Sequence, residues 1–131
     1  DYTRQSGIAG SVKLLGRLFN TRDYLASADV FVLPSRREGM SNALMEAMLF
    51  ELPCVATDIS GSRDLIQNKI NGLIVPPADV QALADGICYM LQHPQEASVM
   101  GRKARYTIIN EYDINLIAQK YLRLYKTLIR S

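Results

Sequence analysis

Tryptophan is absent from the 131-residue sequence, histidine occurs once, at His93, and cysteine occurs twice, at Cys54 and Cys88. A metal site built on His and Cys needs several ligands at close spacing, so these residues predict that the chain binds no metal. Both cysteines stand in apolar stretches, which favours reduced thiols in the core over a disulfide bridge. His93 directly precedes Pro94, which favours a structural place at a helix end over catalysis.

Long apolar runs are also missing. The longest strictly aliphatic or aromatic run is residues 30–33, whereas a membrane-spanning helix needs about 20 apolar residues. The N-terminus has no signal-peptide hydrophobic region. The sequence therefore predicts a cytoplasmic protein, with peripheral contact with the inner face of the membrane as the one membrane role left open.

Net charge is low, at +2, which argues against nucleic acid as the main partner. The charge is unevenly distributed, because residues 1–37 carry +3, residues 38–100 carry −6 and residues 101–131 carry +5. The basic C-terminal part fits either the solvated face of a helix or a contact with anionic lipid or phosphate.

The composition is that of an ordinary globular domain, with 48% hydrophobic and 21% charged residues. This length supports one core, so residues 1–131 are expected to form a single domain. Short apolar runs bounded by Gly and Pro alternate with helical patterns, which predicts an α/β fold with a parallel sheet. The four expected strands are residues 12–15, 30–33, 54–56 and 73–75.

Helical patterns fill most of the remaining chain, and polar residues able to cap a helix precede several of them. The expected starts are Asn20 or Thr21, Ser41 or Asn42, Asp79, about Gln95, and Ile114, with a further helical turn over residues 61–67. The last helix is amphipathic and needs an apolar partner surface. Its apolar positions are Ile114, Ile117, Tyr121, Leu124 or Tyr125, and Leu128.

A glycine-rich turn between a first strand and a helix, typical of nucleotide-binding domains, is missing. The nearest candidate, Gly16-Arg17-Leu18, has one glycine and is interpreted as the end of a strand. We therefore expect the opening strands of the sheet to be absent from this chain. Their absence would leave apolar surface uncovered, which predicts self-association.

The most informative stretch runs from Leu33 to Met48, where a strand ends, the chain turns at Gly39 and a helix begins. Ligands of parallel sheets collect at the carboxyl ends of the strands, next to helix N-termini. The first helical turn from Asn42 has no acidic residue, so its free N–H groups and partial positive charge suit an anion. The stretch predicts a diphosphate site.

Two carboxylates, Glu38 and Glu46, flank this stretch eight positions apart. A carboxylate accepts hydrogen bonds from neighbouring sugar hydroxyls, so one can hold a ribose and the other a hexose on either side of a diphosphate. That arrangement fits a nucleotide sugar. From spacing alone, a turn residue and an exposed helix residue explain the two glutamates equally well.

The residues themselves resemble a known family. The segments that carry the resemblance are FVLPS at 31–35, EGMSNALMEAM at 38–48, PCVATD at 53–58, GSRDLI at 61–66 and NGLIVPP at 71–77. Together they resemble the C-terminal, nucleotide-sugar-binding half of the family 4 glycosyltransferases of GT-B fold, truncated on its N-terminal side. The resemblance covers nearly the whole chain from about Val12.

The resemblance implies a Rossmann-like sheet with helices on both faces and a helical C-terminal extension. It also implies a hexosyltransferase-type activity that moves a sugar, with retention, from a nucleoside diphosphate sugar to an acceptor hydroxyl in surface polysaccharide or capsule synthesis, without cofactor or metal. Glu38 would be the catalytic carboxylate at the donor sugar, and Glu46 would hold the ribose. The other donor-binding residues would be Gly39, Met40, Ser41 and Asn42 at the diphosphate and sugar, and Gly16, Arg17 and Leu18 near the base.

Departures from the family pattern limit these expectations. The acceptor-binding N-terminal domain and the upstream Gly-Arg and Lys of the diphosphate clamp are missing, so the chain is expected to be inactive alone. Glu51 stands where the family usually has a helix-ending glycine. At most one of Arg36 and Arg37 is expected to reach the diphosphate, and Arg63 is a similar candidate.

Two other functions stay open. A non-catalytic interaction module would dock through the amphipathic helix from Ile114. A sugar-nucleotide epimerase of the same GT-B architecture would need catalytic carboxylates and histidines in its cleft. His93 is poorly placed for that, and Glu38 and Glu46 fit the transferase pattern better.

Overall fold

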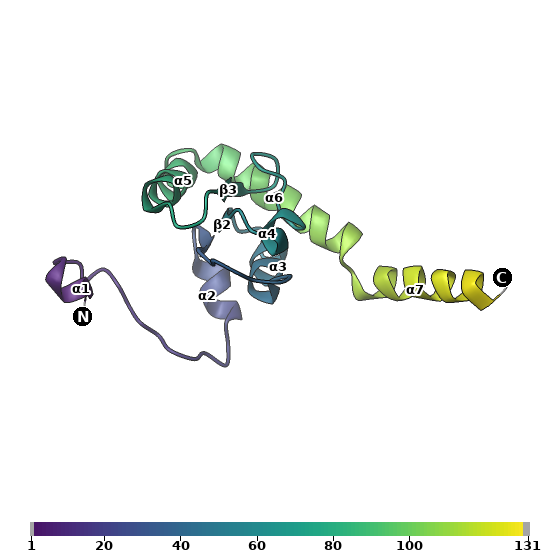
Figure 1. Cartoon of the computed structure of the whole chain (residues 1–131). Helices are drawn as coiled ribbons and strands as arrows, with labels where there is room; N and C mark the ends of the chain where they lie inside the picture. The colour runs from purple at the N-terminus through teal and green to yellow at the C-terminus, as the bar shows by residue number, and fades with distance from the viewer. Residues whose placement is uncertain (1, 130–131) are drawn as a thin grey trace.

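The computed structural model describes residues 2–129, which form seven helices and three short strands (Figure 1). The elements are α1 Tyr2–Gln5, α2 Arg22–Ser27, β1 Phe31–Leu33, α3 Asn42–Leu49, β2 Cys54–Thr57, α4 Ser60–Arg63, β3 Leu73–Val75, α5 Val80–Gln92, α6 Pro94–Glu111 and α7 Ile114–Ile129. The body contains α2 to α6 and the sheet, while α1 and α7 extend from it in opposite directions (Figure 1).

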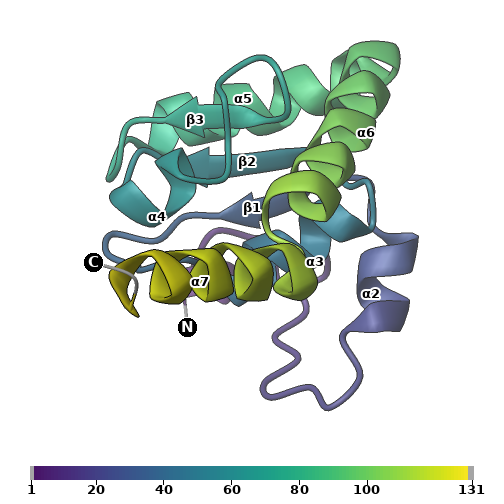
Figure 2. The same cartoon turned by 90° about the vertical axis from the view of Figure 1, so that its right-hand side faces the viewer.

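The three strands form one parallel sheet in the order β1-β2-β3. Phe31 pairs with Cys54, and Val55 pairs with Leu73. All four residues of β2 are buried, as expected for the central strand of a sheet covered on both faces. Figure 2 shows the three strands side by side, with their order running from β1 to β3.

Alternate residues of β2 face two separate parts of the core, because successive strand side chains point to opposite faces. Cys54 and Ala56 pack with Leu44, Ala47 and Met48 of α3 on one face. On the other face the buried residues are Val55, Leu73, Val75, Met90, Ala97 and Met100. Helix α6 contributes to both groups, so it ties the two faces together.

The expected α/β fold is confirmed, and so are the strands after residue 30 and the long C-terminal helices. The expected strand at residues 12–15 is wrong, since this segment has no strand structure and Leu14 is 85% exposed. A strand is stable only when its backbone pairs with a neighbour, and within residues 2–129 β1 pairs with β2 alone. The sheet therefore has three strands where four were expected.

Polar caps begin two helices as expected. The hydroxyl of Ser41 accepts a hydrogen bond from the Leu44 N–H at 3.4 Å, and the carboxylate of Asp79 accepts one from the Ala82 N–H at 2.9 Å. Each cap uses one of the N–H groups that a helix start leaves unpaired.

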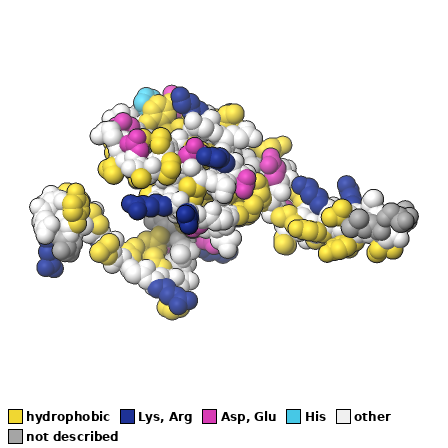
Figure 3. Space-filling view, in the orientation of Figure 1, with side chains coloured by type: hydrophobic (Ala, Val, Ile, Leu, Met, Phe, Trp, Pro, Cys, Tyr) yellow, Lys and Arg dark blue, Asp and Glu magenta, His cyan; other side chains and the backbone are white. Residues whose placement is uncertain are grey.

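Helix α7 has the expected amphipathic pattern, and its apolar side is largely uncovered. Ile114 is 73% exposed, and Tyr121, Leu124 and Tyr125 are all more than half exposed. Hydrophobic side chains lie along one side of this helix and basic ones along the other (Figure 3). The side chain of Leu128 lies outside what the structure describes. Within residues 2–129 no helix combines the length and apolar character that crossing a bilayer requires.

The C-terminal end of α3 is a Schellman motif with a glutamate at the position that glycine usually takes. The N–H of Leu52 donates to the Ala47 carbonyl at 3.2 Å, and the N–H of Glu51 donates to the Met48 carbonyl at 3.1 Å. Glu51 has φ of 60°, in the left-handed region that disfavours any residue with a Cβ. The helix end expected from the family is therefore present despite the glutamate, at a cost in backbone strain.

We predict that Glu51→Gly raises the free energy of unfolding by about 1 kcal/mol, because glycine adopts this conformation without strain. The Glu51 carboxylate also lies 3.8 Å from Arg105 Nε in an exposed ion pair, which contributes little. Glu51→Ala is the matched control, since it removes the carboxylate but keeps the Cβ. Urea unfolding should show a higher free energy of unfolding for Glu51→Gly than for wild type or Glu51→Ala. If Glu51→Ala were as stable as Glu51→Gly, relief of backbone strain would not be the cause.

The two cysteines differ in environment, and only one lies in the core as expected. Cys54 is fully buried, its thiol donates to the Leu52 carbonyl at 3.2 Å, and desolvation by burial raises its pKa to about 12. Cys88 on α5 is an exposed free thiol, so the expectation of a core position there is wrong. It lies on the side of α5 turned away from the sheet, although its sequence neighbours are apolar.

We predict that a maleimide labels Cys88 and spares Cys54 in the folded protein at about pH 8, because only an accessible thiolate reacts. Peptide mass spectrometry after a short exposure measures the two sites separately, and labelling in denaturant gives the control in which both react. Equal labelling in the folded state would mean that β2 is not buried as described.

Candidate functional site

The loop between β1 and α3, residues 34–41, leaves the carboxyl end of β1 and delivers the chain to the start of a helix. Glu38, Gly39 and Met40 in this loop and Asn42 at the start of α3 are exposed. Ser41 is 4% exposed and its hydroxyl is used as the cap of α3. Of the predicted diphosphate-binding residues, Ser41 can therefore offer its backbone N–H but not its hydroxyl.

Thr57 at the end of β2 fixes the start of this loop. Its hydroxyl lies within hydrogen-bond distance of the Ser35 carbonyl and 3.3 Å from the Leu33 carbonyl, both on the chain leaving β1. Thr57 is 3% exposed, so this contact is shielded from water. The sequence does not reveal this role of Thr57, because the contact joins residues that are 22 positions apart.

Gly61 in α4 fixes the tip of the same loop. A Cβ built on Gly61 would lie 1.8 Å from the Gly39 carbonyl oxygen and 3.0 Å from that of Glu38. No side chain fits there, so the absence of one lets α4 pack against the loop backbone. The sequence signal was a lone glycine inside a short helical turn, Ser60-Gly61-Ser62, which does not reveal what it packs against.

The two carboxylates lie at separate points of this region. Within residues 2–129 the Glu38 side chain has neither a hydrogen bond nor an ion pair, so its carboxylate is open to a ligand. Glu46 lies just over one turn into α3, and its Oε2 accepts a hydrogen bond of 3.4 Å from the Thr21 hydroxyl. The contact brings the segment before α2 against α3.

A pocket of about 310 Å³ lies beside Glu46. Its other lining residues are Phe19, Asn20, Thr21, Arg22, Leu49 and Phe50. The volume is at the lower end of the range for small-molecule sites. A larger pocket, of about 400 Å³, shares Phe50 with this one and includes Asp29 and Pro53 at the amino ends of the strands. Pocket volume therefore does not identify the binding site.

The predicted base-binding turn precedes this pocket without lining it. Gly16 has φ of 64°, and neither it nor its neighbour Arg17 is buried. The Arg17 guanidinium lies 5.7 Å from the centre of the Phe19 ring, in a cation–π contact. The structure brings Phe19 and Thr21 toward Glu46, whereas Gly16, Arg17 and Leu18 stay outside the pocket.

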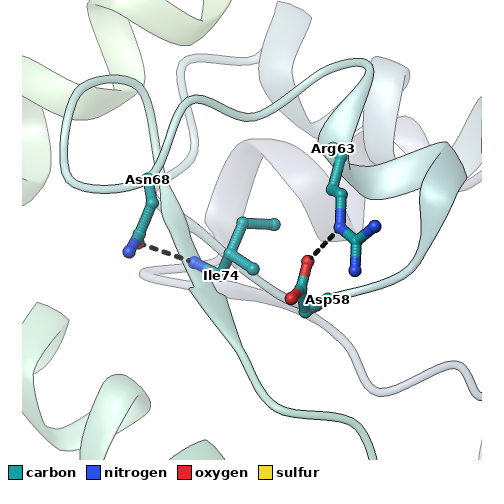
Figure 4. Close-up of polar contacts among 4 residues, drawn as sticks. All are labelled: Asp58, Arg63, Asn68 and Ile74. Atoms are coloured by element: carbon teal, nitrogen blue, oxygen red, sulfur yellow. Dashed lines mark hydrogen bonds and ion pairs between the residues drawn. The ribbon is translucent and has the colours of Figure 1, made fainter.

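One charged pair stands at the same carboxyl edge of the sheet. Arg63 Nε donates to Asp58 Oδ1, as Figure 4 shows. The hydrogen bond from Arg63 lowers the pKa of the Asp58 carboxyl, and the Asp58 carboxylate raises the pKa of the Arg63 guanidinium. Both groups are charged at neutral pH, so they add an oriented ion pair to the edge.

The other residues with reactive side chains lie apart from this edge. His93 stands between α5 and α6, where its ring stacks on Tyr89 at 4.2 Å, in keeping with the expected structural place. Within residues 2–129 no group of three or more His, Cys, Asp or Glu side chains is arranged to hold a metal ion.

Comparison with known proteins gives a family. The model of the family described as glycosyl transferases group 1 matches residues 1–93. An N,N'-diacetylbacillosaminyl-diphospho-undecaprenol alpha-1,3-N-acetylgalactosaminyltransferase of Campylobacter jejuni is 30% identical over 94% of this chain, and the Staphylococcus aureus capsular polysaccharide biosynthesis glycosyltransferase CapM is 26% identical over 92%. The chain spans 32% of the length of each of these relatives.

A solved structure agrees with this assignment at the level of the fold. Anabaena HepE in complex with UDP superposes with a TM-score of 0.90 and 24% identity, covering 95% of this chain and 35% of that protein. Its fold is the α/β architecture described above. The chain belongs to the group 1 glycosyl transferases.

Proposed function

We propose that this chain is the donor-binding part of a retaining glycosyltransferase that moves a sugar from a nucleoside diphosphate sugar to an acceptor hydroxyl of a surface polysaccharide. The observation that carries the proposal is the segment from Glu38 to Asn42, exposed except at Ser41, which Thr57 and Gly61 hold at the carboxyl edge of the sheet beside the start of α3. Family membership and the activities of the two relatives support it.

The proposed roles follow from the chemistry of each group. The open carboxylate of Glu38 contacts the donor sugar, and Glu46, beside its pocket, accepts hydrogen bonds from the ribose hydroxyls. The backbone N–H groups of Gly39, Met40, Ser41 and Asn42 receive the diphosphate. When the bond to the sugar breaks, negative charge develops on the diphosphate, and fixed N–H donors at a helix start stabilise it without having to reorganise.

The base is proposed to lie beyond Glu46. Phe19 and Thr21 line that pocket, so they join the turn Gly16, Arg17 and Leu18 as the candidates nearest the base. An exposed Phe ring offers an apolar face for a base to stack on.

The uncovered apolar side of α7 favours a second role for the chain, as an interaction module. This role is compatible with donor binding, because α7 extends away from the body that carries the Glu38 loop (Figure 1). Shortening α7 should affect assembly with a partner and leave nucleotide binding unchanged.

The first test distinguishes the proposed roles of Glu38 and Glu46. We predict that Glu46→Ala weakens binding of both the nucleoside diphosphate and its sugar derivative by about ten- to hundredfold, the value of hydrogen bonds to a charged acceptor. Glu38→Ala should weaken only the sugar derivative, because Glu38 is placed at the sugar. Calorimetric titration with UDP, GDP, UDP-glucose and GDP-mannose measures both effects.

The control for this test is Glu96→Ala, which removes a carboxylate at the start of α6. Titrations are run on this chain and on a longer protein that carries it with an acceptor-binding domain. If the folded longer protein binds none of these nucleotides, or if Glu96→Ala matches Glu46→Ala, the proposed function fails.

A second test compares two glycines of the site. A Cβ at Gly39 meets nothing within 4 Å, whereas one at Gly61 overlaps the loop backbone. We predict that Gly39→Ala keeps the free energy of unfolding and weakens donor binding, because a ligand must approach its backbone. Gly61→Ala should lower the free energy of unfolding by about 1–3 kcal/mol and weaken binding as well.

Urea unfolding and UDP or GDP titration measure the two properties separately. Gly10→Ala is the control, since a Cβ there also meets nothing, and it should change neither property. Unchanged binding in Gly39→Ala would contradict the proposed approach of the diphosphate to the loop.

A further inference from the structure

Arg63 is held in a fixed place at the carboxyl edge by Asp58. Asp58 directly follows β2, and its N–H donates to the Val75 carbonyl at 2.8 Å, which ties it to the end of β3. Arg63 is the last residue of α4, and its N–H donates to the Ile59 carbonyl at 3.0 Å. The Asp58 carboxylate then receives Arg63 Nε (Figure 4). The backbones of both residues are therefore anchored before their side chains meet.

The contact uses only part of the guanidinium. Arginine has five N–H donors, of which Nε carries one and the two Nη nitrogens carry four. Within residues 2–129 Asp58 engages Nε, and the Nη nitrogens have no hydrogen-bond partner. The Arg63 side chain is 63% exposed. Asp58 thus orients the guanidinium while leaving its outer donors open to a ligand.

Arg63 and the Glu38 loop lie at the same carboxyl edge of the sheet, since Asp58 follows β2 and the loop follows β1, its parallel neighbour. Gly61, two residues before Arg63, packs its backbone on Gly39 and Glu38. Residues two apart on a helix point to nearly opposite sides, so the bond to Asp58, and not the Gly61 contact, places the Arg63 side chain. Arg36 and Arg37 are nearby in sequence, but within residues 2–129 neither has a hydrogen bond or ion pair that would orient it.

We propose that Arg63, oriented by Asp58, is a phosphate-contacting residue of this site. This inference rests on the proposed function and extends it. A helix start supplies only about half a positive charge, which leaves a diphosphate incompletely neutralised. The Arg63 guanidinium adds a cation, partly offset by the Asp58 carboxylate, and paired Nη donors that match phosphate oxygens. The phosphate belongs either to the donor or to a phosphate-carrying acceptor, and Asp58 acts as the positioning residue.

The test begins with Arg63→Met, which keeps an apolar stem and removes the charge. If the phosphate is that of the donor, the Kd for UDP or GDP, whichever wild type binds, rises about tenfold, the usual effect of a charge-assisted hydrogen bond. The Kd of the nucleoside without phosphates, uridine or guanosine, stays unchanged. The salt dependence of nucleotide binding becomes shallower.

If the phosphate is that of the acceptor, nucleotide binding is unchanged and the KM for a phosphate-carrying acceptor rises in the longer protein, with kcat retained. Asp58→Asn should give a smaller loss of the same kind, because the guanidinium is present but less well oriented. Arg63→Lys should recover the charge but not the full affinity, since an ammonium lacks the planar fork.

The control is Arg102→Met on α6, an exposed arginine that also has one side-chain partner, Ser98, at 2.7 Å. All variants should unfold at wild-type urea concentrations, because exposed ion pairs contribute little to stability. Normal nucleotide and acceptor binding by folded Arg63→Met would overturn this inference alone, provided that Glu46→Ala still weakens nucleotide binding. If Arg63→Met weakened phosphate binding and Asp58→Asn did not, the positioning role of Asp58 would be overturned.

Discussion

The backbone contact between Gly61 and Gly39 is the constraint on which the candidate site depends. A side chain at position 61 would overlap the Gly39 carbonyl oxygen, so α4 reaches the loop only because residue 61 has none. This contact and the Thr57 hydroxyl bond to Ser35 fix a loop that has no regular structure of its own. The position of Glu38 relative to the start of α3 follows from these two contacts.

The parts of the fold that depend on neighbouring residues could be predicted from the sequence. Ser41 before α3 and Asp79 before α5 act within three residues of their partners, and both cap the helices as expected. Residues 12–15 have the apolar content of a strand, but a strand also needs a partner, which composition cannot supply. The same limit applies to Cys88, whose apolar sequence neighbours do not tell which side of α5 faces the sheet.

The candidate site also contains residues that the sequence predicts and residues that it does not. Glu38, Glu46 and the loop between them were predictable because a strand end, a glycine and a helix cap lie in one short segment. Thr57 and Gly61 were not, because each acts on a residue that is 22 positions away in the sequence. The sequence pattern therefore predicts the groups that we propose to meet a ligand, whereas the contacts that hold those groups in place appear only in three dimensions.

Overall charge would argue against an anionic ligand at this edge, since residues 38–100 carry −6. Salt screens exposed charges beyond about 8 Å at physiological ionic strength, so most of these carboxylates contribute little to the field at the loop. Backbone N–H groups and a guanidinium within hydrogen-bond distance of a phosphate are not screened in this way. Local backbone N–H groups and a guanidinium, rather than the summed charge of the segment, are therefore the groups that we propose to select the ligand of this edge.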